Sequence, residues 1–161
     1  MILGIISDTH DNLPKIKAAM ELFVSRGIGR VIHCGDYCSP FALAPIKEAG
    51  FRDVFGVFGN NDGEKLWMNT LFSNIGKIEK PPAFINIEGR RIAVLHEPMP
   101  DDVMAALPVD IVLFGHTHQK VLRPGKPVVV NPGECCGYLT GRATVAIVDT
   151  GTLEAEIIEL G

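Results

Sequence analysis

The chain has 161 residues, of which 47% are hydrophobic and 21% charged, and its formal net charge is −4. This length and balance predict a single domain over residues 1–161 with a packed core, and they exclude a disordered or coiled-coil chain. No run of Lys or Arg is longer than the pair Arg90-Arg91. We therefore expect no long nucleic acid as a partner, although a small phosphorylated substrate is compatible with the charge.

The cysteines are spaced in a way that gives no framework of cross-links. They are Cys34, Cys38, Cys135 and Cys136, with no Cys-x-x-Cys pair, which predicts neither disulfides nor a zinc ribbon. No apolar run is long enough for a membrane span, and the apolar segment before Asp8 is too short for the core of a signal peptide. We expect a cytoplasmic protein with reduced thiols and no membrane partner, and a homo-oligomer is compatible with these features.

The first half of the chain alternates short apolar runs with helical patterns. The expected strands are Ile2–Ile6, Arg30–His33 and Asp53–Phe58,. The expected helices are Leu13–Val24 with Asn12 as its N-cap and Gly27 after its end, a stretch between Pro40 and Gly50, and Gly63–Phe72,. This alternation predicts a mostly parallel sheet with helices packed on it.

The second half is richer in strands. Glu88-Gly89 favours a hairpin turn between the strands Ala83–Ile87 and Arg91–Leu95,. The other expected elements are a short helix over Asp101–Leu107 and strands over Ile111–Phe114, Val128–Val130, Thr144–Val148 and Leu153–Ile158. This half is therefore partly antiparallel, and two sheets packed face to face with helices outside would bury the apolar residues.

Side chains that bind metals follow the ends of five predicted strands. In chain order they are Asp8 and His10, Asp36, Asn60 and Asp62, His96, and His116 and His118. Ligands bind beyond the carboxyl ends of strands in α/β sheets, so neighbouring strands would bring these residues together. Imidazole and carboxylate ligands suit Mn, Fe, Zn, Ni or Co, and the set is too large for one tetrahedral zinc. Two ions sharing a carboxylate would use all of it, and Asp36, alone after its strand, is the natural bridge.

Each of these residues also has a purely structural interpretation. Asp8, Asn12 or Asp62 could cap a helix, and a lone His96 after a strand could be a structural histidine. His33 lies within a strand, and we expect it to pack or hydrogen-bond. The structural interpretation fits the residues singly, but their repetition at successive strand ends favours a metal centre.

Five motifs follow one another along the chain: Asp8-Thr9-His10, Gly35-Asp36, Gly59-Asn60-Asn61-Asp62, His96 and Gly115-His116-Thr117-His118. Together they resemble the calcineurin-like metallophosphoesterase superfamily. Within it the chain is most similar to the small single-domain bacterial and archaeal phosphodiesterases, through its length and Asn131-Pro132-Gly133. The resemblance implies an α/β fold, a four-layer α-β-β-α sandwich with two mixed β-sheets.

The resemblance also implies how two divalent transition-metal ions would be held. One would be bound by Asp8, His10, Asp36 and His118, and the other by Asp36, Asn60, His96 and His116. Mn is the foremost candidate, with Ni, Fe, Zn or Co as alternatives. Asp36, Asn60, Asp62 and His96 are the expected catalytic residues, and Asn12 and Asn61 are expected to contact the substrate phosphate.

The chain departs from the family pattern at three places. Asn61 stands where many members have a histidine thought to assist the leaving group, and an amide cannot act as a general acid. Asp62 or a metal-bound water is the alternative proton donor. Glu97-Pro98 replaces a glycine after the strand-end histidine and is expected to shape or narrow the pocket. Glu134 stands where small relatives often have Ser.

The expected function is hydrolysis of a small phosphodiester by a hydroxide that bridges the two ions. Diester preference rests on the family resemblance and on the missing motif histidine, since diester leaving groups need less protonation. A phosphomonoesterase of the same mechanism is one alternative, and a non-catalytic metal-binding scaffold resembling the retromer sorting subunit is another. The chain lacks the His-x-His start of many other metal-dependent hydrolases and the Gly-rich loop of an NTP-binding switch,.

Overall fold

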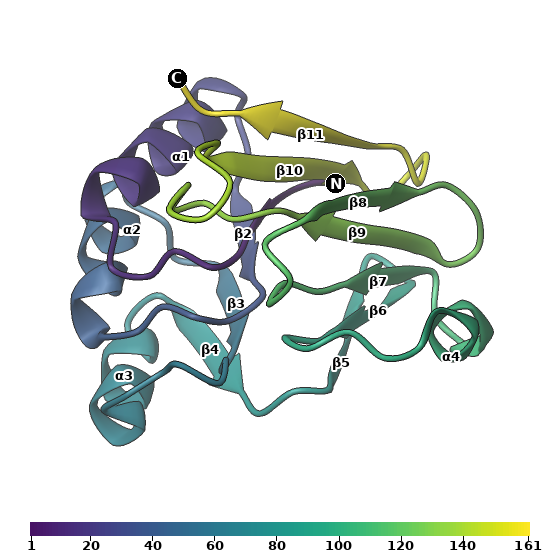
Figure 1. The fold of residues 1–161 in the computed structure, drawn as a ribbon, viewed down its shortest axis with the longest axis horizontal. Helices are drawn as coiled ribbons and strands as arrows, with labels where there is room; N and C mark the ends of the chain where they lie inside the picture. Colours follow the sequence, from purple (N-terminus) through teal and green to yellow (C-terminus); the bar gives the residue numbers. More distant parts are fainter.

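The computed structural model describes all residues from 1 to 161, and two β-sheets packed face to face form its centre (Figure 1). The first sheet contains β1 (Ile2–Ile6), β2 (Arg30–His33), β3 (Val54–Val57), β4 (Gly76–Glu79), β10 (Thr144–Asp149) and β11 (Ala155–Glu159). The second contains β5 (Ala83–Ile87), β6 (Arg90–Val94), β7 (Ile111–Leu113), β8 (Lys120–Arg123) and β9 (Val128–Pro132). The strand orders are β11-β10-β1-β2-β3-β4 and β5-β6-β7-β9-β8.

Both sheets are mixed. Strands β1 to β4 run parallel, and β10 and β11 continue the first sheet with antiparallel pairing. In the second sheet β6, β7 and β9 run parallel, with β5 and β8 antiparallel at the two edges. The predicted α/β fold with two mixed sheets is therefore confirmed. The parallel strands matter for function because the loops that follow them carry the expected ligands.

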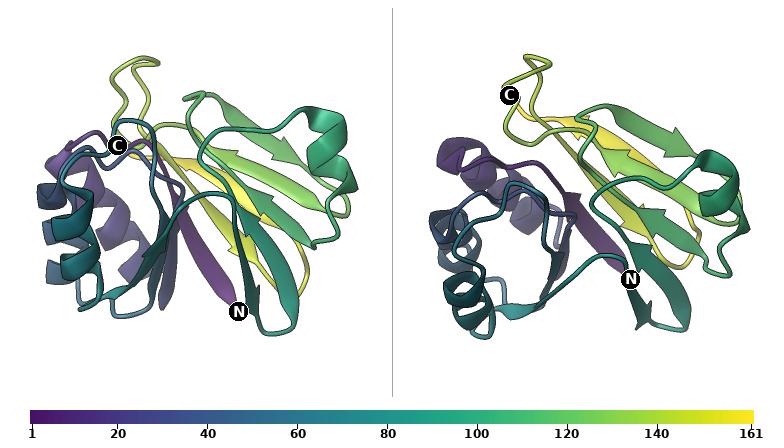
Figure 2. Two further views of the ribbon diagram at one scale, coloured as in Figure 1. Left: turned by 90° about the horizontal axis from the view of Figure 1, so that it is seen from below. Right: turned by 60° about the horizontal axis from the view of Figure 1, so that its bottom comes forward.

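The helices are distributed unevenly over the two sheets (Figure 2). Helices α1 (Leu13–Ser25), α2 (Leu43–Glu48) and α3 (Lys65–Phe72) cover the outer face of the first sheet. The outer face of the second sheet carries only the short helix α4 (Asp101–Ala106), whose buried Met104 packs on Val112 and Phe114. The fourth layer of the sandwich is thus a single short helix.

Residues from both sheets fill the space between them. Leu3 and Ile5 of β1 join a cluster of 15 buried residues that includes Ile111 and Leu113 of β7. Val112, between those two, points instead to the cluster under α4. The central strands are buried on both faces, which is why they read as continuous apolar runs rather than as alternating patterns.

Two edge strands were not expected from the sequence. In β4 only Ile78 is fully buried, and in β8 no residue is. Such short edge strands expose most of their side chains, so they give little hydrophobic signal. Their pairing with β3 and β9 is a consequence of tertiary packing.

The helix starts also differ from the prediction. Pro40 opens a short 3-10 turn capped by Ser39, and α2 itself begins at Leu43. Helix α3 begins at Lys65 rather than Gly63, because Glu64 adopts a left-handed conformation with φ of 46°. None of the helices has the length and apolarity needed to cross a membrane.

Gly4 allows helix α1 to approach the first sheet closely. A Cβ atom at this position would lie 2.8 Å from the ring of Phe23, which is fully buried on α1. We expect Gly4→Ala to lower the free energy of unfolding by about 1–3 kcal/mol through overpacking, measured by urea denaturation. Gly29→Ala is the control, since a Cβ there meets no atom within 4 Å. Equal stability of the two variants would contradict this explanation.

Candidate metal centre

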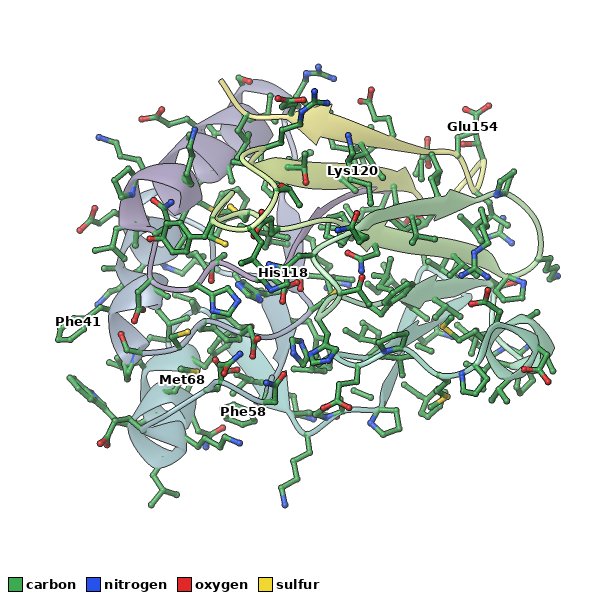
Figure 3. The ribbon with its side chains drawn as sticks, viewed as in Figure 1. Phe41, Phe58, Met68, His118, Lys120 and Glu154 are labelled. Atoms are coloured by element: carbon green, nitrogen blue, oxygen red, sulfur yellow. The ribbon has the colours of Figure 1, made fainter.

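The expected ligands converge at one end of the sandwich, on loops that follow β1, β2, β3, β6 and β7. Figure 3 shows many nitrogen- and oxygen-bearing side chains gathered around the labelled His118, between the two sheets. The structure therefore brings together residues separated by up to 110 positions in the sequence, from Asp8 to His118. They form two groups, which we call the first and the second half-site.

The first half-site contains Asp8, His10, Asp36 and His118. The Nε2 atoms of His10 and His118 are 3.3 Å apart. Nε2 of His118 lies 3.5 Å from Oδ1 of Asp8, and Nε2 of His10 lies 3.6 Å from Oδ2 of Asp36. Asp8, His10 and Asp36 present their ligand atoms within 4.8 Å of one another, as a metal ion would need.

The second half-site contains Asp36, Asn60, His96 and His116. Oδ1 of Asn60 lies 2.8 Å from Nε2 of His96 and 3.0 Å from Nδ1 of His116. Nε2 of His96 is also 3.4 Å from Oδ1 of Asp36. The two oxygens of Asp36 thus face different half-sites, which is the arrangement of a bridging carboxylate.

Backbone conformation aims these side chains. Five of the seven expected ligands are non-glycine residues with positive φ: Asp8, His10, Asp36, His116 and His118, with values from 40° to 66°. Such conformations are costly and cluster at functional sites, where surrounding contacts hold them in place. Here the amide groups of Thr9 and His10 both donate to the carbonyl oxygen of Asp36, at 3.0 and 3.1 Å. These hydrogen bonds hold the loop after β1 and the loop after β2 in place relative to each other.

The Nδ1 atoms of His96 and His118 face away from the site, and the hydrogen bonds that they make determine the tautomer of each ring. Nδ1 of His96 lies 2.8 Å from the carbonyl oxygen of Cys34, which can only accept, so that nitrogen donates. Nδ1 of His118 donates in the same way to Oε2 of Glu134 at 2.7 Å. When either ring is neutral, its Nε2 carries a lone pair directed into the site. In the second half-site this lone pair faces Oδ1 of Asn60, another acceptor, and a cation between them would satisfy both.

The charge of the site also favours cations. Asp8 and Asp36 are 0% and 1% exposed, and their only partners among basic side chains within 4.0 Å are histidines. Burial raises the pKa of Asp36, but hydrogen bonds with His96 and Asn61 outweigh it and hold the pKa well below its usual range. Burial of this kind also raises the pKa of Asp8. Buried carboxylates need compensating positive charge, so the residues present fit divalent metal ions.

Glu134, which the sequence marked only as a departure from the family pattern, is in direct contact with His118. It is fully buried, and besides His118 its carboxylate accepts hydrogen bonds from Leu139, Thr140 and the thiol of Cys136. Burial opposes its ionisation, but the bonds from Thr140, His118 and Leu139 outweigh this and lower its pKa to about 2. An ionised Glu134 orients His118 and raises the basicity of its Nε2.

Both carboxylate oxygens of Asp62, a residue predicted to be catalytic, accept hydrogen bonds from the backbone. Its Oδ2 accepts from the amide of Gly59 at 2.6 Å, and its Oδ1 from the amide of Cys38 at 2.8 Å. It also caps no helix, since α3 begins at Lys65. Burial raises its pKa, but both oxygens are engaged by backbone donors. This geometry supports a structural role, in which Asp62 ties the loop carrying Asn60 to the loop after β2.

The two expected phosphate contacts are also engaged within the protein. Asn61 donates its backbone amide and its Nδ2 to the two oxygens of Asp36, at 2.9 and 2.8 Å. Asn12 caps α1 by accepting from Lys15, and its Nδ2 donates to the carbonyl oxygen of Cys136. Asn61 therefore positions the carboxylate of Asp36, and Asn12 joins α1 to the loop that follows Glu134.

His33 packs where the sequence predicted a structural histidine. It is fully buried, stacks on Tyr37 with ring centroids 3.6 Å apart, and accepts from the amide of Gly35 through Nδ1. Its Nε2 lies 3.1 Å from the hydroxyl of Thr9. His33 therefore stabilises the loop that carries Asp36.

Comparison with known proteins gives a consistent set of relatives. Residues 1–153 match the calcineurin-like phosphoesterase superfamily domain. The chain is 36% identical to phosphodiesterase MJ0936 of Methanocaldococcus jannaschii, over 99% of both sequences. It is 29% identical to phosphodiesterase YfcE of Escherichia coli, over 83% of this chain and 78% of that protein.

Solved structures agree with these sequence matches. An archaeal phosphodiesterase superposes with a TM-score of 0.90 at 35% identity, over 99% of this chain and 100% of the other. Vps29 of Entamoeba histolytica superposes with a TM-score of 0.66 at 18% identity over the full length of both chains. The second likeness, at that identity, shows a shared fold alone.

The contact between Glu134 and His118 generates a prediction about metal affinity. We expect Glu134→Gln to weaken Mn²⁺ binding roughly 10- to 100-fold, because His118 loses the charged acceptor that orients it. Isothermal titration of chelator-treated protein with Mn²⁺ measures this. Glu48→Gln, on the exposed side of α2, is the matched control. Unchanged affinity in a folded Glu134→Gln variant would refute the positioning role.

Proposed function

Because the chain belongs to the calcineurin-like phosphoesterase superfamily, we propose that it hydrolyses small phosphodiesters with two divalent metal ions held in its two half-sites. Hydrolysis of phosphoester bonds is the activity of the family, and the named relatives are phosphodiesterases.

The observation that carries the proposal is the position of Asp36. Its two oxygens face different sets of histidines, His10 on one side and His96 on the other. We assign Asp8, His10, Asp36 and His118 to one ion and Asp36, Asn60, His96 and His116 to the other. The imidazole, amide and carboxylate ligands suit Mn²⁺, and they are equally compatible with Ni, Fe, Zn or Co.

When bound, a pair of such ions supplies an activated water near neutral pH and offsets the charge that develops on the phosphoryl oxygens. The chain itself supplies orientation. Glu134 and the carbonyl oxygen of Cys34 fix the rings of His118 and His96, and Asn61 holds both oxygens of Asp36. These three ligands are therefore positioned before substrate arrives, which lowers the reorganisation needed in the reaction.

Diester and monoester substrates differ in how strongly their leaving group needs a proton from the enzyme. Asn61 stands where many relatives have a histidine, and an amide donates no proton at ordinary pH. Both carboxylate oxygens of Asp62, the other candidate donor, accept backbone hydrogen bonds. Neither of these two motif residues is therefore placed as a proton donor, which supports substrates with good leaving groups and a single phosphoryl charge.

Asp36→Asn tests the bridging assignment. Loss of the shared charge weakens both ions, and since the ions supply several kcal/mol of transition-state stabilisation, we expect at least a roughly hundredfold fall in kcat/KM. The assay is hydrolysis of bis-p-nitrophenyl phosphate by chelator-treated protein with added Mn²⁺, Ni²⁺ or Zn²⁺. Asp102→Asn, at an exposed position of α4, is the control.

The metal content of each protein, measured in parallel, decides among the outcomes. Full metal content and full turnover in Asp36→Asn would contradict the bridging role. Folded wild-type protein that binds two ions per chain but hydrolyses no phosphoester would instead favour a non-catalytic scaffold.

A further inference from the structure

A cavity of about 420 Å³ opens beside the second half-site. His96 and Asn60 form part of its lining, so it is continuous with the proposed reaction centre. Small-molecule sites usually have volumes of about 300–1,000 Å³, and a cavity of this size accepts a group as large as a nucleoside. The cavity lies between the loop after β3 and the loop after β6, with the β4–β5 connection as its third wall.

The wall of this cavity has an apolar part suited to a flat ring. Phe58, Leu95 and Met99 supply it, together with Pro81 and Pro82. Leu95 is buried, while Phe58 and Met99 are partly exposed to solvent. Aromatic and thioether side chains in a concave wall are typical of sites that bind aromatic groups.

The same cavity carries two cations at its rim. Lys65 and Lys80 line it, and neither has a carboxylate within 4.0 Å, in contrast to Lys77, which pairs with Glu79. Nζ of Lys65 lies 5.5 Å from the centroid of the Phe58 ring, so a charge stands directly beside the aromatic surface. Glu97 is the one acid in the lining, and it offers an acceptor for hydroxyl groups.

A second cavity, at the first half-site, has a different character. It measures about 190 Å³ and is lined by His118, Gln119, Lys120, Thr140, Arg142 and Thr144, with no apolar side chain. Figure 3 shows Phe58 and Lys120 on opposite sides of His118. This smaller polar cavity suits an ion or a short polar group, whereas a ring with an attached anion fits the larger one.

We propose that the larger cavity is the specificity pocket of the enzyme, and that it binds the organic arm of a phosphodiester built on a nucleoside phosphate. In this inference, which rests on the proposed function, the ring lies against Phe58 and Met99. An additional phosphate of the arm is bound by Lys65 and Lys80. The preferred substrate is thus a diester with one large anionic aromatic arm.

The experiment compares two substrates with the same leaving group. They are the p-nitrophenyl ester of thymidine 5′-phosphate with and without an additional 3′-phosphate, assayed with metal-loaded protein. Two exposed lysine contacts predict a roughly three- to tenfold higher kcat/KM for the substrate with the extra phosphate. The preference should diminish as salt concentration rises.

The double variant Lys65→Ala/Lys80→Ala should remove this preference, so that the ratio of kcat/KM for the two substrates falls to about 1. Lys120→Ala, in the smaller cavity, is the matched control and should keep the preference. The proposal is overturned if the wild type shows no preference, if the double variant retains it, or if Lys120→Ala abolishes it.

Binding provides a readout that does not depend on turnover. Thymidine 3′,5′-bisphosphate, titrated calorimetrically into metal-loaded protein, should bind several-fold more weakly to the double variant than to wild type or Lys120→Ala. Equal binding by all three proteins, or no binding to wild type, contradicts the pocket. Absence of hydrolysis on every substrate, combined with the expected binding pattern, would refute the proposed function and leave the pocket standing.

Discussion

The carboxylate of Asp36 is the point on which the site depends. It is buried and ionised, it faces histidines of both half-sites, and no Lys or Arg lies close enough to neutralise it. A charge in that environment is stable only where directed donors and cations surround it. Within the protein, the groups that surround this carboxylate are Asn61, His96 and His10. Because they come from different sheets and loops, the position of Asp36 requires the two sheets to pack together correctly.

The packing of the two sheets therefore positions the loops that carry the expected metal ligands. The cluster between them joins β1 and β2 to β6 and β7, and each of these strands ends two to five residues before a ligand. The loops beyond carry left-handed residues whose cost of about 1–3 kcal/mol each is offset by the core and by hydrogen bonds between loops. The amides of Thr9 and His10 bonding to one carbonyl of the Asp36 loop are an example. Stability of the fold and precision of the ligands are supplied by the same contacts.

The sequence predicted the central elements because those elements carry strong signals. Buried parallel strands give continuous apolar runs, and the ligands follow them directly, so the convergence of Asp8, Asp36 and His96 could be inferred without coordinates. The edge strands β4 and β8 could not, since exposed side chains leave no periodicity.

The roles of individual polar residues were harder to infer than their location. Asp62 belongs to a family motif, yet its oxygens accept from two backbone amides, and no pattern in the sequence reveals the direction of a side chain. Glu134 follows β9, whereas His118 follows β7, and the two residues come into contact only because these strands lie side by side. Hydrogen-bond partners between loops depend on three-dimensional placement, which one sequence does not encode locally.

Asn61 shows how one substitution changes several properties together. Its backbone and side-chain amides donate to both oxygens of Asp36, so the residue that stands in place of the family histidine also holds the carboxylate of Asp36 in position. The half-sites differ in exposure as well: Asp8 and Glu134 are fully buried around the first, whereas Asn60 and His116 are exposed at the second. The larger cavity adjoins that exposed side. The cavity beside His96 measures about 420 Å³ and has an apolar wall, whereas the one beside His118 measures about 190 Å³ and has none, and this asymmetry favours recognition of the organic arm beside His96.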